Sequence, residues 1–488
     1  MGSDTMARAQ IEPAQEEQDP RAGGLGCGGI AAVRVDRGKG PFHGVLAGGQ
    51  RERDVIGGDG GSRARQARGR CRASSSRSVR DGTRGFGMMG SHALEVEFSL
   101  LRQWLFEQAL PLWSTAAVDR RSGGFFEWLT EDGAPVEEPR RARVTGRQIY
   151  SFAIAEQLGW DGPTRDLVRH GLVSLESFIG TNGFVVPLKT VDGTVLRHDF
   201  DLYDHAFVLF GLAAAVGTGE QCARLEALAE QLRGRIQAHF AHPVAGFQEG
   251  PRGSVVLKAN PHMHMLEAAL AWETISDDPA WGALADEIAE LCLEKFIDPE
   301  TGALREFFDH DWNRIEEAPG DLVEPGHQFE WAWLLKRWGL SRNRPDAFRV
   351  ADRLIAVGEQ YGICRERGLA YNELNGDLSI RIGTSRLWPQ TERIKAHVIS
   401  YATAVSEQAA EASARLAVEA IRALRRYFEY PLRGGWHEYI DVEGRPIRNN
   451  TRTSSLYHII CAISEVADLI DTGNARRQHR QVARVASF

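Results

Sequence analysis

The fold is decided by short helix starts such as residues 324–331, which read Glu-Pro-Gly-His-Gln-Phe-Glu-Trp. Pro325 and Gly326 are typical of the mouth of a helix, and the apolar residues that follow predict that the helix continues. His327 and Glu330 lie three residues apart on it and therefore share a face. An imidazole beside a carboxylate at a helix start is a common arrangement for proton transfer. The motif gains weight because similar helix starts recur along the chain.

A second signature consists of a glycine, an aromatic or aliphatic residue and a short extended run. It occurs at Gly124, Gly183, Gly246, Gly302, Gly368 and Gly435, with spacings of 59, 63, 56, 66 and 67 residues. Self-similarity at a nearly fixed period indicates a repeat architecture. Each glycine follows one helical stretch and precedes a second, more apolar one. The second helices are predicted at residues 146–158, 203–216, 261–273, 327–338, 389–401 and 454–469.

Six helical hairpins can form either an open solenoid or a closed ring of six inner and six outer helices. Solenoid repeats are usually shorter, about 33–47 residues. The short extended runs and long loops favour the closed form, with the more apolar helices inside. We therefore predict an all-α fold, an (α/α)6 barrel with short strands at its rim. It should span residues 91–475, followed by a C-terminal tail at residues 476–488.

The N-terminal 90 residues differ in composition from the rest of the chain. Residues 1–86 hold 15 Arg or Lys and 10 Asp or Glu, whereas the whole chain of 488 residues has a net charge of −8. This Gly-, Arg- and Ser-rich segment lacks a sustained hydrophobic period, so we predict that residues 1–90 form a disordered basic extension. The remaining body is acidic, which argues against a nucleic-acid partner.

The sequence also predicts the compartment. Its longest apolar runs are shorter than the roughly 18 residues of a membrane span, and its start lacks the apolar core of a signal peptide. The six cysteines contain no CxxC pair, which indicates free thiols in a reducing compartment. We expect a cytoplasmic protein with no membrane partner.

Polar, titratable or aromatic residues open all six predicted inner helices. In a closed barrel these helix starts meet at one rim, which is typical of a site for a small polar ligand. Trp388 offers a flat face for the C–H groups of a sugar. The candidate ligand contacts are Arg147, Tyr203, Asp204, Asn260, Trp388, Gln390 and Glu392, and the candidate catalytic residues are His264, His327, Glu330 and His458. We expect Glu330 to orient His327.

The segment His262-Met263-His264 invites a metal interpretation. On a helix, residues two apart point to different sides and chelate poorly. We predict no metal, with His327 or Glu330 as the alternative third ligand should one bind, and we expect no other cofactor. The remaining histidines are expected on the surface or in loops: His170, His198, His239, His242, His310, His397 and His437.

Three motifs together resemble the N-acylglucosamine 2-epimerase superfamily. They are residues 260–268 (Asn-Pro-His-Met-His-Met-Leu-Glu-Ala), residues 324–331 and residues 386–392 (Arg-Leu-Trp-Pro-Gln-Thr-Glu). The resemblance covers about residues 93–475 and implies an (α/α)6 barrel. The His-Met-His segment and the third motif look more like the bacterial mannose-isomerase and mannose-6-phosphate-isomerase-like branch than the animal-type 2-epimerases.

The resemblance also implies roles for individual residues. His327 and His458 correspond to the acid/base pair, and Arg147 to the arginine that opens the first inner helix. His264 corresponds to a residue linked to ring opening and substrate binding. Placing His327 at a helix start should favour its neutral, basic form.

The expected function is therefore an aldose–ketose isomerase for a mannose-type monosaccharide, working through a cis-enediol as a monomer or homodimer. A sugar 2-epimerase shares this intermediate and is the alternative. The same barrel also hosts glycoside hydrolases, but these need two opposed carboxylates, and the predicted site is richer in histidine. A pure binding protein would need no acid/base histidines.

Overall fold

The computed structural model describes residues 86–249, 256–316 and 320–485. The predicted N-terminal extension lies outside the described residues up to residue 85, and helix α1 (Phe86–Trp104) already begins within the segment assigned to it. At the other end, helix α13 (Ser455–Val485) continues past residue 475, where we placed the end of the barrel.

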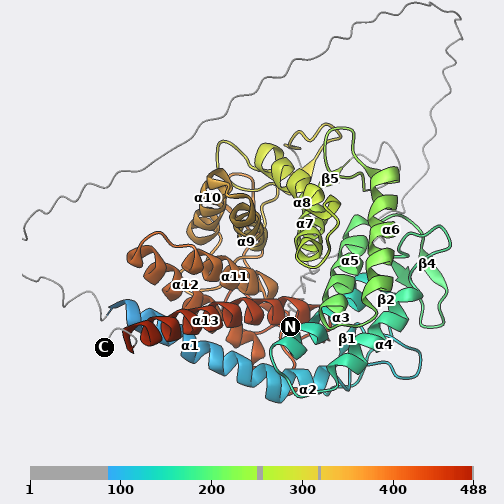
Figure 1. Ribbon diagram of the computed structural model, residues 1–488, viewed down its shortest axis with the longest axis horizontal. Helices are drawn as coiled ribbons and strands as arrows, with labels where there is room; N and C mark the ends of the chain where they lie inside the picture. The colour runs from blue at the N-terminus through green and yellow to red at the C-terminus, as the bar shows by residue number, and fades with distance from the viewer. Residues whose placement is uncertain (1–85, 250–255, 317–319, 486–488) are drawn as a thin grey trace, which may run out of the picture. The chain divides into compact units, whose positions relative to one another are not determined.

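Six helices form an inner ring, as the repeat predicted. Each packs against the next, and the last packs back against the first, so the ring is closed (Figure 1). The inner helices are α3 (Ala142–Gln157), α5 (Leu202–Gly217), α7 (Ala259–Glu273), α9 (Pro325–Arg342), α11 (Trp388–Ala402) and α13. The fold is an all-α (α/α)6 barrel.

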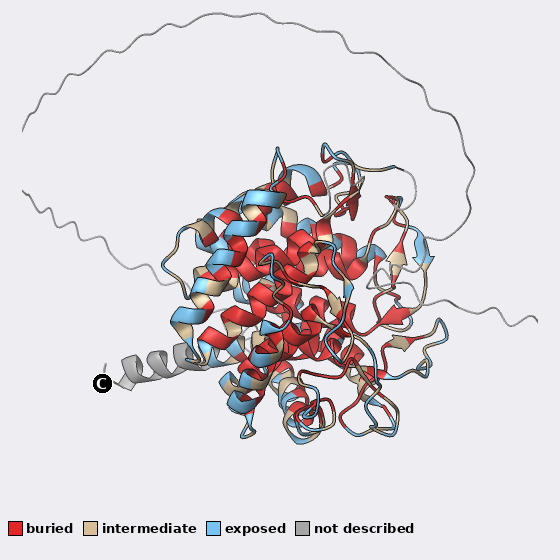
Figure 2. Ribbon diagram, turned by 90° about the vertical axis from the view of Figure 1, so that its right-hand side faces the viewer, coloured by how far each residue is buried: buried red, intermediate tan, exposed pale blue. Residues whose placement is uncertain are grey.

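An outer helix covers each inner one. The inner helix packs against the outer helix that follows it, and α1 covers α13. The other outer helices are α4 (Thr164–Glu176), α6 (Cys222–Phe240), α8 (Ala280–Leu291), α10 (Pro345–Tyr361) and α12 (Glu407–Arg425). A π-helical turn and short helix α2 (Leu110–Trp113) extend α1, and a second π-helical turn (Cys292–Phe296) extends α8. Figure 2 shows that the inner helices are buried, whereas the outer helices expose one side.

The glycine repeat builds the same turn in all six units. A backbone N–H two or three residues after the glycine donates to a carbonyl at the end of the preceding helical segment. The six bonds are Phe126 to Ala117, Val186 to Phe178, Gln248 to Phe240, Arg305 to Phe296, Tyr371 to Gly362 and His437 to Tyr427. In each turn a glycine has φ between 70° and 87°, a conformation that side chains with a β-carbon rarely adopt. In the sixth unit that glycine is Gly434, one residue before the predicted Gly435.

Short antiparallel strands tie neighbouring units together at the rim. In four strand pairs, residues just before an inner helix pair with the strand that follows the glycine of the next unit, and the other two pairs are hairpins within one unit. The strands are β1 (Trp128–Leu129), β2 (Arg140–Arg141), β3 (Leu188–Lys189), β4 (Val195–Arg197), β5 (Leu257–Lys258), β6 (Phe307–Phe308), β7 (Glu373–Leu374), β8 (Ile380–Ile382), β9 (Ser385–Arg386), β10 (Tyr439–Ile440) and β11 (Thr451–Arg452). The pairs are β2–β3–β4, β5–β6, β7–β8, β9–β10 and β11–β1. Because β11 pairs with β1, the strands also join the last unit to the first.

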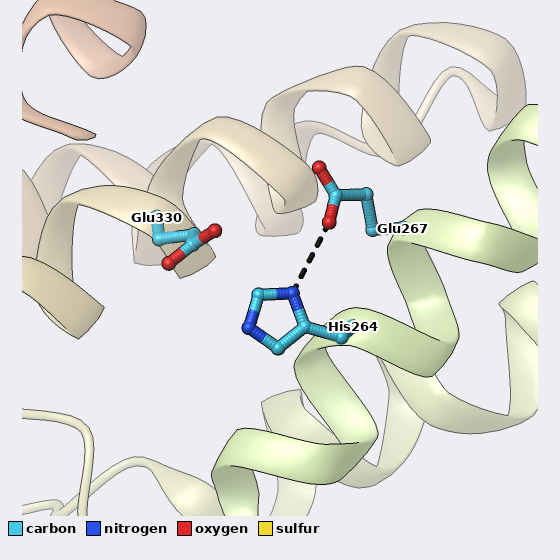
Figure 3. A group of neighbouring side chains, drawn as sticks. All are labelled: His264, Glu267 and Glu330. Carbon is cyan, nitrogen blue, oxygen red and sulfur yellow. Dashed lines mark hydrogen bonds and ion pairs between the residues drawn. The ribbon is translucent and has the colours of Figure 1, made fainter. Parts of the chain in front are cut away.

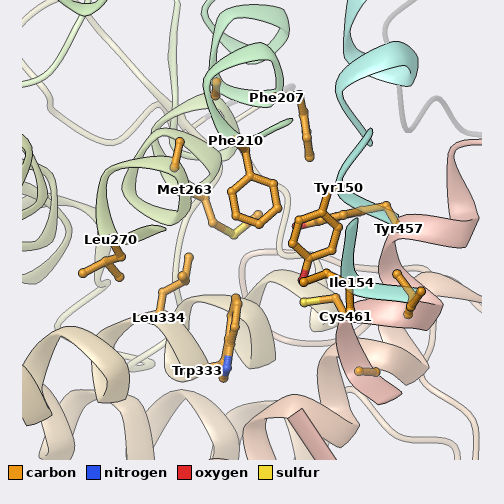
Figure 4. Close-up of a cluster of buried hydrophobic side chains, with 14 of the residues drawn as sticks. Tyr150, Ile154, Phe207, Phe210, Met263, Leu270, Trp333, Leu334, Tyr457 and Cys461 are labelled. Atoms are coloured by element: carbon orange, nitrogen blue, oxygen red, sulfur yellow. The ribbon is translucent and has the colours of Figure 1, made fainter. Parts of the chain in front are cut away.

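Apolar side chains from several inner helices fill the interior beyond their first turns (Figure 4). Tyr150 of α3 stacks on Phe210 of α5 with ring centroids 4.5 Å apart, and Tyr457 of α13 meets Tyr150 edge-on at 5.4 Å. Met263 of α7 and Trp333 of α9 are also fully buried. Burying such side chains stabilises the fold by about 1.5–3 kcal/mol each. This core holds the helix starts in fixed positions around the rim.

Among the described residues, no helix combines the length and apolar character that crossing a membrane requires. The four described cysteines, Cys222, Cys292, Cys364 and Cys461, are free thiols.

Candidate active site

Four side chains near the inner helix starts bind the scaffold rather than one another. The backbone N–H groups of Val185, Phe247, Leu304 and Ala370 donate to His205, His262, Gln328 and Gln390 over 2.8–3.2 Å. We call these four acceptors the latch residues. Each satisfies a buried backbone N–H of the strand after a repeat glycine. Burial lowers the pKa of both latch histidines to about 4, which keeps their rings neutral and able to accept.

The prediction that Gln390 contacts substrate is not supported by this geometry. Its side-chain amide also donates to the carbonyl of Arg386 over 3.0 Å, and the residue is fully buried.

His262 and His264 point to different partners, as the helical spacing predicted. His397 was expected on the surface or in a loop, and this was wrong. It is buried on α11, and its Nε2 lies 2.8 Å from Glu359.

His327 lies in the first turn of α9, beside two carboxylates. Its Nδ1 is 2.9 Å from Oε2 of Glu306 and 3.9 Å from Oε2 of Glu324. Burial lowers the pKa of His327, but Glu306 and Glu324 outweigh burial and raise it to about 10. Two expectations were therefore wrong. The carboxylate that orients His327 is Glu306, not Glu330, and the ring is cationic at neutral pH because these carboxylates dominate over its position at the helix start.

His458 lies in the first turn of α13 and contacts a carboxylate on α11. Its Nδ1 is 2.9 Å from Oε1 of Glu392, which also accepts from the hydroxyl of Thr391 over 3.0 Å. The other oxygen of Glu392 forms an ion pair with Nζ of Lys395. When Glu392 is ionised it can only accept, so the Nδ1 of His458 then carries the hydrogen, and the lone pair of a neutral ring is on Nε2.

Trp388 lies near both histidines. Its ring centroid is 5.0 Å from that of His327 and 5.8 Å from that of His458. The indole is only 4% exposed, so it offers less open surface to a ligand than the sequence suggested. This arrangement brings together two imidazoles that are 131 residues apart in the sequence.

His264 forms a third imidazole–carboxylate pair, which Figure 3 shows beside Glu330. Its Nδ1 is 3.1 Å from Oε2 of Glu267, and the hydroxyl of Tyr457 donates to the same carboxylate over 2.5 Å. Burial lowers the pKa of His264. Burial would raise the pKa of Glu267, but the hydrogen bond from His264 and the charge of Lys395 outweigh it and lower that pKa to about 2. His264 is thus a neutral ring held by an ionised partner.

Glu330 connects the clusters around His264 and His458. Its carboxylate and the groups of His264 and Glu267 have donor atoms within 4.8 Å of one another, and the same holds for Glu330, Glu392 and His458. Burial and the charge of Glu392 raise the pKa of Glu330 to about 7. A carboxyl group in that range exchanges a proton readily near neutral pH.

Each of these two clusters offers imidazole and carboxylate groups, which are common ligands of divalent metals. In the second cluster the ammonium of Lys395 already pairs with Glu392, and it lies 3.5 Å from Oε1 of Glu330. A lysine in that position supplies the positive charge that these carboxylates would otherwise draw from a cation. The donor set therefore fits a protein-internal ion pair better than a metal.

The remaining predicted contacts lie on α3, α5 and α7. Nη2 of Arg147 donates to the hydroxyl of Tyr203 over 2.5 Å, and its guanidinium lies 4.1 Å from the ring of Phe207. Asp204 is fully buried and accepts from the backbone N–H of Arg143 over 2.9 Å, which indicates a structural role. Asn260 is the second residue of α7 rather than its cap, and its buried Oδ1 has no hydrogen-bond partner. That oxygen is a candidate acceptor for a ligand hydroxyl.

Sequence reasoning missed Glu267, Glu306, Lys395 and the role of Tyr457. Glu267 and Lys395 each follow a predicted site residue by three positions on the same helix, so helical spacing could have found them. Glu306 is 21 residues from His327 and lies after a repeat glycine. Only the strand pairing between β5 and β6 places it against the rim.

The comparisons with known proteins agree with this barrel. The family model for N-acylglucosamine 2-epimerase matches residues 124–462. A mannose-6-phosphate isomerase of Rhizobium meliloti (strain 1021) is 41% identical over 76% of this chain and 96% of its own length. A D-mannose isomerase of Thermobifida fusca is 28% identical over 61% of this chain and 78% of its own length.

Among solved structures, a cellobiose 2-epimerase from Bacillus thermoamylovorans B4167 superposes with a TM-score of 0.68 at 20% identity. It covers 76% of this chain and 98% of its own length, and it supports the fold. The fold and the family place this protein among the sugar isomerases and epimerases. The chain belongs to the N-acylglucosamine 2-epimerase family, and it is an enzyme of the isomerase class.

Proposed function

We propose that the protein interconverts a mannose-type aldose and the corresponding ketose. The observation that carries this proposal is the pair formed by His327 and His458, each bound through Nδ1 to its own buried carboxylate and each in contact with the ring of Trp388. The relatives named mannose-6-phosphate isomerase and D-mannose isomerase support the substrate class.

The reaction moves two hydrogens and needs no oxidant. In the open-chain sugar, Nε2 of neutral His458 removes the proton from C2, and the C–H electron pair forms a C1=C2 double bond. The cationic His327 gives a proton to O1, which completes a cis-enediol. Proton return to C1 with loss of the O2 proton gives the ketose, and His327 and His458 regain their starting charges over the cycle.

The other site residues support ring opening and binding. Neutral His264 lies within the reach of Glu330, whose pKa of about 7 suits proton exchange with the ring oxygen of a cyclic sugar. Arg147 can stabilise negative charge on a sugar oxygen. Asn260 and Tyr203 offer further hydrogen-bonding groups.

The arginines before α3 bear on whether the sugar is phosphorylated. Arg140 pairs with Asp119 at 2.9 Å, Arg141 with Glu127 at 3.3 Å, and Arg143 with Asp204 at 3.5 Å. Because each arginine already has a carboxylate partner, these residues do not decide for or against a phosphate on the sugar. The test below therefore includes both mannose and mannose 6-phosphate. We further propose a cytoplasmic protein that acts as a monomer or homodimer. The free thiols support the compartment.

Proton NMR of the purified protein with either sugar in D2O tests the proposal. An aldose–ketose isomerase forms fructose or its 6-phosphate and incorporates deuterium. Formation of glucose with deuterium at C2 would instead identify a 2-epimerase, and absence of both exchange and product would overturn the proposal. His327→Asn and His458→Asn should each lower kcat by about 10²–10⁴-fold.

A further inference from the structure

The polar cluster contains a buried lysine that the proposed chemistry does not use. Lys395 on α11 has no exposed surface, and its Nζ pairs with Oε2 of Glu392 and lies 3.5 Å from Oε1 of Glu330. The ammonium also lies 3.9 Å from the ring centroid of Trp333, a cation–π contact. A lysine is seldom fully buried unless its charge is satisfied, and here two carboxylates and an aromatic face satisfy it.

The position of Lys395 matters because Glu392 contacts His458. The two oxygens of Glu392 have separate partners: Oε1 accepts from His458 and Thr391, and Oε2 faces the ammonium. Burial raises the pKa of Glu392 to about 7, and Lys395 is the strongest influence in the opposite direction. The carboxylate of Glu330 lies in the same cluster, and two desolvated carboxylates that close together tend to share a proton.

The environment of the other histidine differs in one respect. Glu306, which contacts His327, has no lysine or arginine partner among the described residues, and Arg386 instead pairs with the more distant Glu324 at 3.0 Å. His327 therefore faces an unneutralised carboxylate, whereas the carboxylate of His458 is neutralised. Each histidine thus lies near two carboxylates and one cation, but the cation pairs with the carboxylate that contacts His458 and with the more distant carboxylate beside His327.

We propose that Lys395 is a positioning residue that decides which imidazole is the base. By neutralising Glu392 it keeps His458 uncharged with its Nδ1–H directed at that carboxylate, so that Nε2 takes the C2 proton and His327 is left as the acid. This inference rests on the proposed isomerase function. Lys395 does not touch the substrate.

Other titratable groups surround the ammonium, and each inner helix packed against α11 contributes. They are Glu330 from α9, Glu267 and His264 from α7, Cys461 from α13, and Glu392 from α11 itself. Lys395→Met and Lys336→Met both keep all of these groups. A change in the pH profile that occurs in Lys395→Met alone therefore reports on the loss of Lys395.

The test is the pH dependence of kcat/KM for sugar interconversion by Lys395→Met. Loss of the ammonium leaves the charge of Glu392 uncompensated, which favours a protonated His458, or it lets Glu392 take up a proton and stop orienting the ring. Both effects remove the base at low pH. The acid limb should therefore move up by about one pH unit or more, a tenfold loss of activity on that side, while KM changes little.

Lys336→Met is the matched control. Lys336 is also buried, on α9, but its Nζ pairs with Asp352 at 2.6 Å and bonds the hydroxyl of Ser400. Its loss should lower the melting temperature and leave the acid limb in place. An equal shift in both variants, or a fall in kcat for Lys395→Met with the limb unchanged, would overturn the inference.

If Lys395→Met does not fold, the inference can be tested on the wild-type protein through the protonation states of His327 and His458. ¹⁵N-histidine NMR at pH 7 should show His458 as the neutral Nδ1–H tautomer and His327 as a cation, with assignments from the two His→Asn variants. A cationic His458, or its Nε2–H tautomer, contradicts the inference. If the wild-type protein interconverts no sugar, the proposed function fails instead, independently of Lys395.

Discussion

Gly326 lies so close to the indole of Trp388 that a β-carbon on it would stand 2.4 Å from Cη2 of that ring. Non-bonded carbon atoms do not approach each other that closely, so Gly326→Ala must displace Trp388 or the start of α9. The ring of Trp388 is in contact with both His327 and His458, and His327 directly follows Gly326 in the sequence. We expect kcat to fall at least about tenfold, since small misplacements of reacting groups are costly.

The control for this variant is Gly234→Ala, in the exposed interior of α6 with no atom near the added carbon. It should leave activity unchanged and stabilise the protein by about 0.5–1 kcal/mol. Steady-state kinetics and thermal melting separate the two. Normal kcat in Gly326→Ala would show that the spacing of the rings is not critical.

Because the pKa of His327 is raised to about 10, activity should fall near pH 10 as this ring loses its proton. The position of this basic limb in the pH profile of kcat/KM should depend on Glu306. In Glu306→Gln the main attraction for the imidazolium is lost, so the limb should move down by about one to three pH units. Glu324→Gln, which removes the carboxylate at 3.9 Å, should have a smaller effect. A limb that responds more to Glu324 than to Glu306 would reverse this assignment.

The same pair has a consequence for stability. A histidine whose pKa is higher in the folded than in the unfolded state stabilises the fold fully below its unfolded pKa of about 6.5. That contribution is lost as pH rises through the folded value of about 10. Wild-type protein should therefore lose more stability between pH 7 and 10 than Glu306→Gln, as measured by urea unfolding at each pH. Parallel curves would argue against the ion pair.

Gln390 is predicted to hold the fold and not the sugar. Gln390→Leu leaves the N–H of Ala370 and the carbonyl of Arg386 without their partner, which should cost about 2 kcal/mol or more. KM should stay within about twofold of wild type, because substrate does not meet this amide. A large rise in KM with an unchanged melting temperature would restore Gln390 to the binding site.

Tyr457 is predicted to act through Glu267 on His264. In Tyr457→Phe the carboxylate loses a donor, so its hold on the ring weakens, and kcat should fall while the barrel stays folded. Tyr430→Phe is the matched control, since that hydroxyl donates to the carbonyl of Asn449 over 2.7 Å and serves no histidine. Equal losses of activity in the two variants would show that Tyr457 has no specific role in catalysis.

The sequence predicted the closed barrel, the six inner helices and the rim strands because those features repeat, and repetition is visible without contacts. It also located His264, His327 and His458, since each opens a helix in the series. It misjudged what surrounds them. Pairing His327 with Glu330 followed helical spacing, whereas the actual partner Glu306 lies in the loop just before strand β6. Gln390 was assigned to the ligand because a polar residue at a helix start has two possible duties, and only the hydrogen bonds distinguish them.

The contact between α3 and the residues that lead into α13 has a consequence for how the chain folds. The amide of Gln148 donates to the carbonyl of Thr453 over 2.9 Å, a bond between residues 305 positions apart. Contacts of such long range form late, because the loop that separates them must first be closed. A growing chain therefore passes through an open arc of hairpins whose two end faces are apolar and unpaired, a form prone to associate with its own kind. The proposed base, His458, joins the other site residues only in the step that removes this hazard.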